Sequence, residues 1–187
     1  MTVIIGGTAT YTETKMENLN KSALLVLHNT NNHANQLVLQ TAAAMDEASF
    51  TAQSSPSHGS VQALLTHMLT TEFFFLARSE GKPVNPKGAP DKTLSLQEIT
   101  VAFSQIADER FKYLNWVTDE KLLEIVDIPI GEHPFKLARW QLLTQSLLHT
   151  AHHRGELSIV MTGLGHPLPT LDAIITFIHE SGQTWPW

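Results

Sequence analysis

The feature that most constrains the fold is a long stretch of helix-forming residues without proline, from about Phe135 to Thr162. It contains His149 and His153, which an α-helix places one turn apart on the same face, because each residue advances the helix by about 100°. Two imidazoles at this spacing can hold one divalent metal ion without bending the backbone. Such a site needs a third ligand from another segment, and the remaining histidines are the candidates.

The same spacing has a simpler interpretation, because the chain contains ten histidines in 187 residues and ordinary helix-face histidines also occur at this separation. The protease pattern His-Glu-x-x-His is absent, since Thr150 occupies the position of the glutamate. Glu156 lies on the face of His149, about 20° away, whereas Arg154 is offset by roughly 140°. We therefore expect Arg154 to brace the bundle or an interface and not to contact a metal.

The composition predicts one domain over residues 1–187, with 42% hydrophobic and 16% charged residues. No apolar run reaches the length of a membrane span, and the N-terminus lacks the basic segment of a signal peptide. The chain has no cysteine, which excludes disulfides, thiolate metal sites and cysteine nucleophiles and fits a cytoplasmic location. Any metal must therefore be held by histidine and carboxylate.

The charge distribution argues against nucleic-acid binding. The formal net charge is −6, and the sequence contains no cluster of Lys and Arg that could form a basic stripe. We expect neither DNA nor RNA as a partner.

Hydrophobic periodicity predicts an all-α bundle of four long helices. Ser95 and Glu98 form the capping-box pattern at the start of the third helix. The alternating residues 124–130 and the turn-like residues 131–134 predict a short β-hairpin before the fourth helix. The expected helices cover about Lys15–Met45, Ser60–Ala77, Ser95–Val117 and Phe135–Thr162, with a surface crossing at Val84–Lys92 and a short fifth helix at Thr170–Glu180.

The middle of the first helix is unusually polar for a core helix. Its residues either form a solvated face, or some of them point into a polar cavity. The candidates for the second interpretation are His28, Asn31, Asn32 and Asn35.

His67 is the best-placed third ligand, because it lies in the middle of the predicted second helix among Leu64, Leu65 and Phe74. A lone histidine on an apolar helix face is more often a core residue with a hydrogen-bond partner, and that interpretation stays open. The other histidines outside the first helix are expected at the surface: His58, His133, His152, His166 and His179.

Three motifs resemble the DinB/YfiT-like superfamily of metal-dependent proteins. They are Leu65-Thr66-His67-Met68-Leu69, the segment from Leu148 to Glu156 with its His-x-x-x-His-Arg-Gly pattern, and His33-Ala34-Asn35. The resemblance extends from about Met16 to Glu180.

This resemblance implies a four-helix bundle with a three-histidine site for a divalent ion, zinc or nickel. Carried over by position, it implies His67, His149 and His153 as the metal ligands. It also implies a homodimer, in which the apolar tail Trp185-Pro186-Trp187 could pack.

The sequence departs from the family pattern at two positions. Glu156 stands where the family commonly has Gln, and His33 stands where it commonly has Trp. We hypothesise that Glu156 is a catalytic general base toward a water at the metal, or a carboxylate near the ion. The alternative is a polar residue that only supports the ligands.

The resemblance and the open coordination position of a three-nitrogen site together predict a metal-dependent enzyme with a small-molecule substrate. The expected reactions are hydrolysis, or an S-transfer that uses a low-molecular-weight thiol as cosubstrate. The alternative is a non-enzymatic stress-response or ligand-binding protein with a structural or incidental metal.

Overall fold

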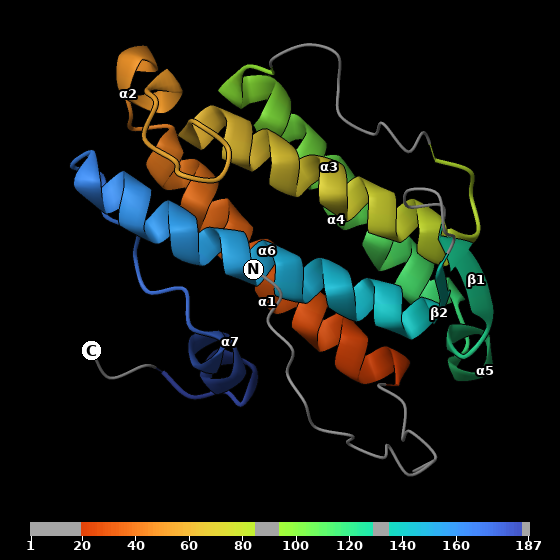
Figure 1. The fold of residues 1–187 in the computed structure, drawn as a ribbon. Helices are drawn as coiled ribbons and strands as arrows, with labels where there is room; N and C mark the ends of the chain where they lie inside the picture. Colours follow the sequence, from red (N-terminus) through yellow and green to blue (C-terminus); the bar gives the residue numbers. More distant parts are fainter. Residues whose placement is uncertain (1–19, 85–93, 129–134, 185–187) are drawn as a thin grey trace, which may run out of the picture.

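Four long helices build the structure, a computed structural model that describes residues 20–84, 94–128 and 135–184. Helices α1 and α3 each pack against both α4 and α6, and the most extensive contact joins α3 to α6 (Figure 1). The predicted all-α four-helix bundle is therefore confirmed. The long helices are α1 (Lys21–Ala42), α3 (Val61–Glu80), α4 (Leu96–Trp116) and α6 (Arg139–Gly163).

Three short helices accompany the four long ones in the described part of the chain. The short helices α2 (Glu47–Thr51) and α5 (Asp119–Leu122) were not predicted from the sequence. The predicted fifth helix is present as α7 (Ala173–Glu180), which packs against α1.

The predicted hairpin is confirmed as strands β1 (Ile125–Ile128) and β2 (Phe135–Ala138), which pair antiparallel. The predicted start of the fourth helix at Phe135 is wrong, because residues 135–138 form β2 and the helix begins at Arg139. Strand pairing gives the backbone groups of this segment partners in β1, which competes with helix formation. The Gln141 side chain then accepts a hydrogen bond from the Ala138 N–H at 2.8 Å, at the first turn of α6.

Capping residues set the other helix boundaries. Ser60 Oγ accepts a hydrogen bond from the Ala63 N–H at 3.1 Å at the start of α3, and the predicted capping box of Ser95 and Glu98 is present at the start of α4. Helix α1 ends three residues before the predicted Met45, and α3 extends three residues beyond the predicted Ala77.

Several predictions fall outside the described residues. These are the first residues of the first helix (15–19), most of the surface crossing (85–92), the hairpin turn with His133 (131–134) and the C-terminal tail (185–187).

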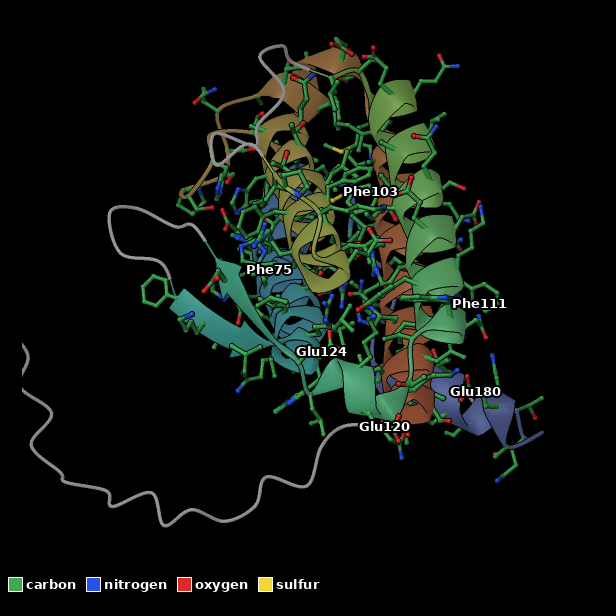
Figure 2. The ribbon with its side chains drawn as sticks, turned by 90° about the vertical axis from the view of Figure 1, so that its right-hand side faces the viewer. Phe75, Phe103, Phe111, Glu120, Glu124 and Glu180 are labelled. Atoms are coloured by element: carbon green, nitrogen blue, oxygen red, sulfur yellow. The ribbon has the colours of Figure 1, made fainter. Side chains whose placement is uncertain are left out.

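The core is formed by aliphatic and aromatic side chains from the four long helices. Phe103 of α4 points between the helices and is 6% exposed, whereas Phe111 on the outer side of α4 is 52% exposed (Figure 2). This amphipathic pattern is what the sequence periodicity predicted. In the part of the chain that the structure describes, no helix combines the length and the apolar character needed to cross a membrane.

Two glycines near the end of α6 allow a matched test of helix stability. A Cβ at Gly163 or at Gly165 would meet no atom within 4 Å beyond its immediate surroundings, but only Gly165 has a left-handed backbone, with φ +84°. We expect Gly163→Ala to raise the free energy of unfolding by about 0.5–1 kcal/mol, because alanine loses less backbone entropy in a helix. We expect Gly165→Ala to lower it by about 1 kcal/mol. Urea denaturation measures both, and equal effects of the two substitutions would contradict the assignment of the helix end.

Candidate metal centre

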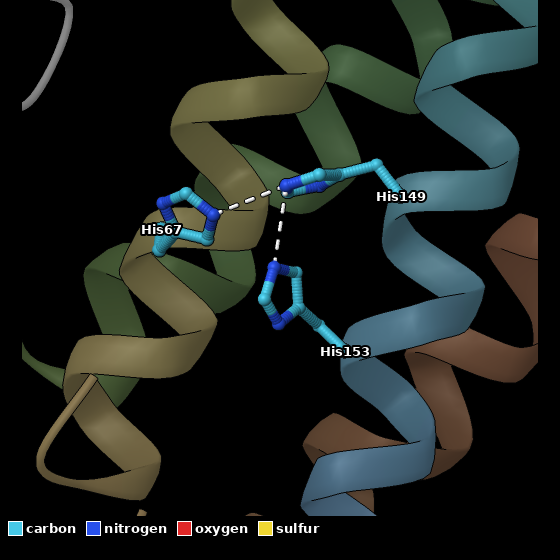
Figure 3. A group of neighbouring side chains, drawn as sticks. All are labelled: His67, His149 and His153. Atoms are coloured by element: carbon cyan, nitrogen blue, oxygen red, sulfur yellow. Dashed lines mark hydrogen bonds between the residues drawn. The ribbon is translucent and has the colours of Figure 1, made fainter. Parts of the chain in front are cut away.

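The structure brings His67, His149 and His153 together between α3 and α6 (Figure 3). His67 Nε2 lies 3.1 Å from His149 Nε2, and His153 Nε2 lies 3.2 Å from the same atom. One nitrogen from each ring belongs to a group whose members all lie within 4.8 Å of one another. The two histidines on α6 are one turn apart, as their spacing in the sequence predicted.

The geometry of these nitrogens fits a shared cation. An imidazole nitrogen carries either one proton or one lone pair, so His149 Nε2 cannot make two full hydrogen bonds with its two neighbours. Nitrogens bound to a tetrahedral zinc at its usual bond length lie about 3.3 Å apart, close to both observed distances. A divalent ion bound to all three lone pairs would satisfy the cluster better than protons do.

Electrostatics keep these imidazoles neutral. Burial and, to a lesser extent, the neighbouring histidines together lower the pKa of His67 to about 4. Burial and the neighbouring His153 lower the pKa of His149 to about 4 as well. The pKa of His153 is lowered too, mainly by burial. Neutral imidazoles offer the lone pairs that a metal requires, without competition from protons near neutral pH.

The second ring nitrogen of each α6 histidine, Nδ1, makes no hydrogen bond within the described part of the chain. His149 Nδ1 and His153 Nδ1 are buried, and neither has a hydrogen-bond partner among the described residues. The nearest charged atom to His153 Nδ1 in an ion-pair geometry is Glu156 Oε2, at 3.7 Å. Glu156 therefore lies next to the histidine cluster, on the face that its spacing predicted.

Glu156 makes its main contacts with the loop before α3. Its Oε1 accepts hydrogen bonds from Ser55 Oγ at 2.6 Å and from the Ser57 N–H at 3.2 Å, and its Oε2 accepts one from Ser57 Oγ at 2.6 Å. Burial raises the pKa of the carboxyl, but these hydrogen bonds outweigh it and lower the pKa of Glu156 to about 2. A carboxylate with so low a pKa is a weak base, which favours a supporting role for Glu156 over the hypothesis of a general base.

His58 differs from the sequence expectation of a surface residue. Its ring is partly buried and stacks on His67, with ring centroids 4.0 Å apart and an angle of 28° between the ring planes. It also meets His153 edge-on, with centroids 5.2 Å apart. No pattern around His58 in the sequence predicted this contact, because it depends on tertiary hydrogen bonds between the loop and α6.

The remaining histidines behave largely as expected. His152 and His179 are exposed, and His166 is partly exposed. His33 of the His33-Ala34-Asn35 motif is exposed on α1.

Beside the histidine cluster, a buried polar network surrounds Glu72 of α3. The Glu72 side chain forms an ion pair with Arg110 of α4, and both residues are 1% exposed. Glu72 Oε1 also accepts a hydrogen bond from Thr150 Oγ1 at 3.1 Å. Burial raises the pKa of Glu72, but Arg110 and the amide hydrogen bonds outweigh this effect, so the pKa stays below its ordinary value. Glu72 is therefore ionised and paired.

Two asparagines of α1 connect Glu72 to a second arginine. The Nδ2 atoms of Asn31 and Asn35 donate to Glu72 Oε1 at 3.1 and 2.9 Å. Their Oδ1 atoms accept hydrogen bonds from Arg154 Nη1 at 2.5 and 2.8 Å. Each amide thus lies between a carboxylate and a guanidinium, and Arg154 braces the bundle as the sequence predicted.

The polar middle of α1 faces inward, as one of the two interpretations proposed. His28, Asn31 and Asn35 are buried. His28 Nδ1 accepts a hydrogen bond from Arg110 Nη1 at 3.0 Å, and burial together with Arg110 lowers its pKa well below the ordinary value. Asn32 and Asn35 also line a cavity of about 400 Å³ between α1 and α4.

Sequence reasoning did not single out Glu72 or Arg110. A signal was present, because Glu72 lies one turn from both Met68 and Leu76, on the mainly apolar buried face of α3. An acid at such a position predicts a buried charge that needs a partner. The identity of that partner, 38 residues away on α4, has no local signal.

Comparisons with known proteins agree on one family. The family model of the DinB family matches residues 16–182. The structure is similar to a DinB-like protein from Bacillus cereus, with a TM-score of 0.63 and 18% identity, over 80% of this chain and 95% of that chain. It is also similar to the DinB-like protein YjoA from Bacillus subtilis, with a TM-score of 0.59 and 20% identity, over 79% of this chain and 97% of that chain. No curated protein matches significantly.

The contacts of Glu72 predict a large loss of folding stability when its carboxylate loses its charge. Glu72→Gln would leave Arg110 buried without its counter-ion, so we expect the free energy of unfolding to fall by about 3–5 kcal/mol. The control is Glu109→Gln, at an exposed position on the same helix as Arg110, for which we expect a change within about 0.5 kcal/mol. Urea denaturation of both variants measures the difference, and a loss below about 1 kcal/mol for Glu72→Gln would show that the ion pair stabilises the fold little.

Proposed function

Because the chain belongs to the DinB family, we propose that it binds one divalent metal ion through His67, His149 and His153 and acts as a metal-dependent enzyme. The observation that carries this proposal is the convergence of three neutral imidazole nitrogens from α3 and α6. Zinc and nickel are the ions we propose, because both accept imidazole ligands.

The residues of the site have separate tasks in this proposal. His67, His149 and His153 hold the ion, and their buried surroundings keep them unprotonated. The ion would supply an open coordination position at which water or a thiol becomes a better nucleophile near neutral pH. We propose hydrolysis, or S-transfer from a low-molecular-weight thiol, on a small-molecule substrate. A thiol would have to come from a cosubstrate, since the chain has no cysteine.

The experiment that tests the metal site is elemental analysis of untagged protein. We expect about one zinc or nickel ion per chain in the wild type, and its loss in His67→Ala, His149→Ala and His153→Ala, because two imidazoles bind a divalent ion far more weakly than three. The matched control is His152→Ala, an exposed neighbour on α6 that should retain the metal. Wild-type protein that stays free of metal after incubation with zinc and with nickel would overturn the proposal.

Treating the same purified protein with a chelator distinguishes a catalytic metal from a structural one. A chelator that abolishes turnover but leaves the melting temperature unchanged supports catalysis. A chelator that lowers the melting temperature strongly, in a protein without turnover in hydrolase and S-transferase assays, supports the structural alternative, because binding free energy then contributes to folding.

We also propose that the protein is a homodimer, as the family resemblance implies, and that the outer face of α6 takes part. Leu148 and Ile159 are 64% and 78% exposed, and their spacing of eleven residues places them on one helix face. His152 and Gly155 lie on the same face between them and add little bulk where a second helix could approach.

The dimer is tested by light scattering on the purified protein. We expect twice the mass of the chain for the wild type, and the mass of one chain for Ile159→Lys, because a charge in an apolar interface is costly to bury. The control is Ile174→Lys, an exposed apolar residue on α7, which should leave the dimer intact. A monomeric wild type would overturn this part of the proposal and leave the metal site unaffected.

A further inference from the structure

The loop between α2 and α3 is fastened to α6 by one carboxylate. Ser55 and Ser57 together donate three hydrogen bonds to Glu156, two of them at 2.6 Å. Within the loop, the Gly59 N–H donates to the Ser55 carbonyl at 3.0 Å, and Ser55 Oγ accepts from the His58 N–H at 3.1 Å. The segment Ser55–Gly59, here named the histidine loop, is thus a closed turn with a defined position on the bundle.

A count of protons along this contact chain assigns the tautomer of His58. Ser57 Oγ lies 2.6 Å from both Glu156 Oε2 and His58 Nδ1, and a hydroxyl group has one proton to donate. An ionised carboxylate can only accept, so the Ser57 proton is directed to Glu156. His58 Nδ1 must then donate its proton to Ser57 Oγ, which leaves the lone pair of the neutral ring on Nε2.

The histidine loop places this ring against two of the three clustered histidines. The His58 ring stacks on His67 at 4.0 Å and meets His153 at 5.2 Å between centroids. A chain from carboxylate through an intervening group to imidazole is the arrangement that fixes the orientation and tautomer of metal-binding histidines. His58 therefore has the tautomer of a ligand and lies beside the cluster, although it belongs to a loop.

On the premise of the proposed function, we propose that His58 is a fourth imidazole of the metal centre, and that Glu156 acts through Ser57 as its positioning residue. The His58 nitrogens lie outside the group formed by His67, His149 and His153. The fourth contact would therefore form when metal binds, by movement of the His58 side chain on the histidine loop.

A second metal ion bound by His58, His153 and Glu156 fits the contacts less well. One ligand atom of each of these residues lies within 4.8 Å of the others. Both Glu156 oxygens, however, already accept hydrogen bonds from Ser55 and Ser57. These hydrogen bonds leave about one lone-pair position of the carboxylate free, so an ion at that place would compete with the contacts that hold the histidine loop.

The chemical consequence depends on the coordination number of the ion. Four imidazoles would complete a tetrahedral zinc site, so a substrate would have to displace His58 from it. An octahedral ion would retain two positions for water or substrate beside the four nitrogens. In the tetrahedral case His58 would govern access to the ion, and in the octahedral case it would border the two free positions.

Cobalt(II) is the probe that tests this proposal, because the intensity and position of its visible absorption report the number and type of ligands. The proteins are the wild type, His58→Ala, Ser57→Ala and Glu156→Gln, with His179→Ala, an exposed histidine on α7, as the control outside the site. We expect His58→Ala to weaken cobalt binding at least tenfold and to change the visible spectrum. We expect Ser57→Ala and Glu156→Gln to weaken binding by about tenfold in the same direction, the usual effect of losing a group that orients a ligand.

The outcomes separate this proposal from the proposed function. If His58→Ala binds cobalt with the affinity and spectrum of the wild type, while His149→Ala does not bind it, the fourth imidazole is overturned and the three-histidine site remains. If Glu156→Gln weakens binding in the His58→Ala background as much as it does in the wild type, Glu156 does not act through His58, and the positioning role is overturned. If the wild type binds no cobalt, both proposals fail.

Discussion

The ionised side chain of Glu72 needs partners inside the bundle, and its contacts connect all four long helices. It lies on α3, pairs with Arg110 of α4, and accepts hydrogen bonds from Thr150 of α6 and from two asparagines of α1. A buried carboxylate is costly unless its charge is compensated and its oxygens accept hydrogen bonds. Hydrogen bonds require close distances and good angles, so this network permits only a narrow range of helix positions. Apolar packing alone tolerates more variation.

The network also links the fold to the candidate metal centre. Thr150, which contacts Glu72, is the chain neighbour of His149, and Glu72 is on the same helix as His67. The register of α3 against α6 that satisfies Glu72 is therefore the register that brings His67 and His149 to 3.1 Å. The polar network and the histidine cluster constrain one interface, the most extensive one in the bundle.

The histidines of the candidate metal centre come from two kinds of segment, long helices and a loop, which differ in rigidity. His67, His149 and His153 come from the middle of long helices, where the backbone is fixed by regular hydrogen bonding. His58 comes from the histidine loop, which is held by the hydrogen bonds of one partly buried carboxylate, Glu156. Loops open at lower free-energy cost than packed helices. In the proposed centre, the three helix histidines would supply a fixed set of nitrogens, and His58 would be the residue that moves when a metal binds.

The sequence by itself determined the features that depend on nearby residues. The periodicity predicted the long helices, Ser95 and Glu98 predicted a helix start, and the spacing of His149 and His153 placed them on one face. The periodicity wrongly predicted a helix from Phe135, where the chain instead forms a strand paired with β1. The sequence proposed His67 as a partner of His149, 82 residues away, with an ordinary core histidine as the alternative, and only the tertiary structure brought the two together. The contact of Ser55 with Glu156, 101 residues apart, had no signal in the sequence. The physical reason is that helix formation and capping act over a few residues, whereas these contacts depend on how whole helices pack and rotate against one another.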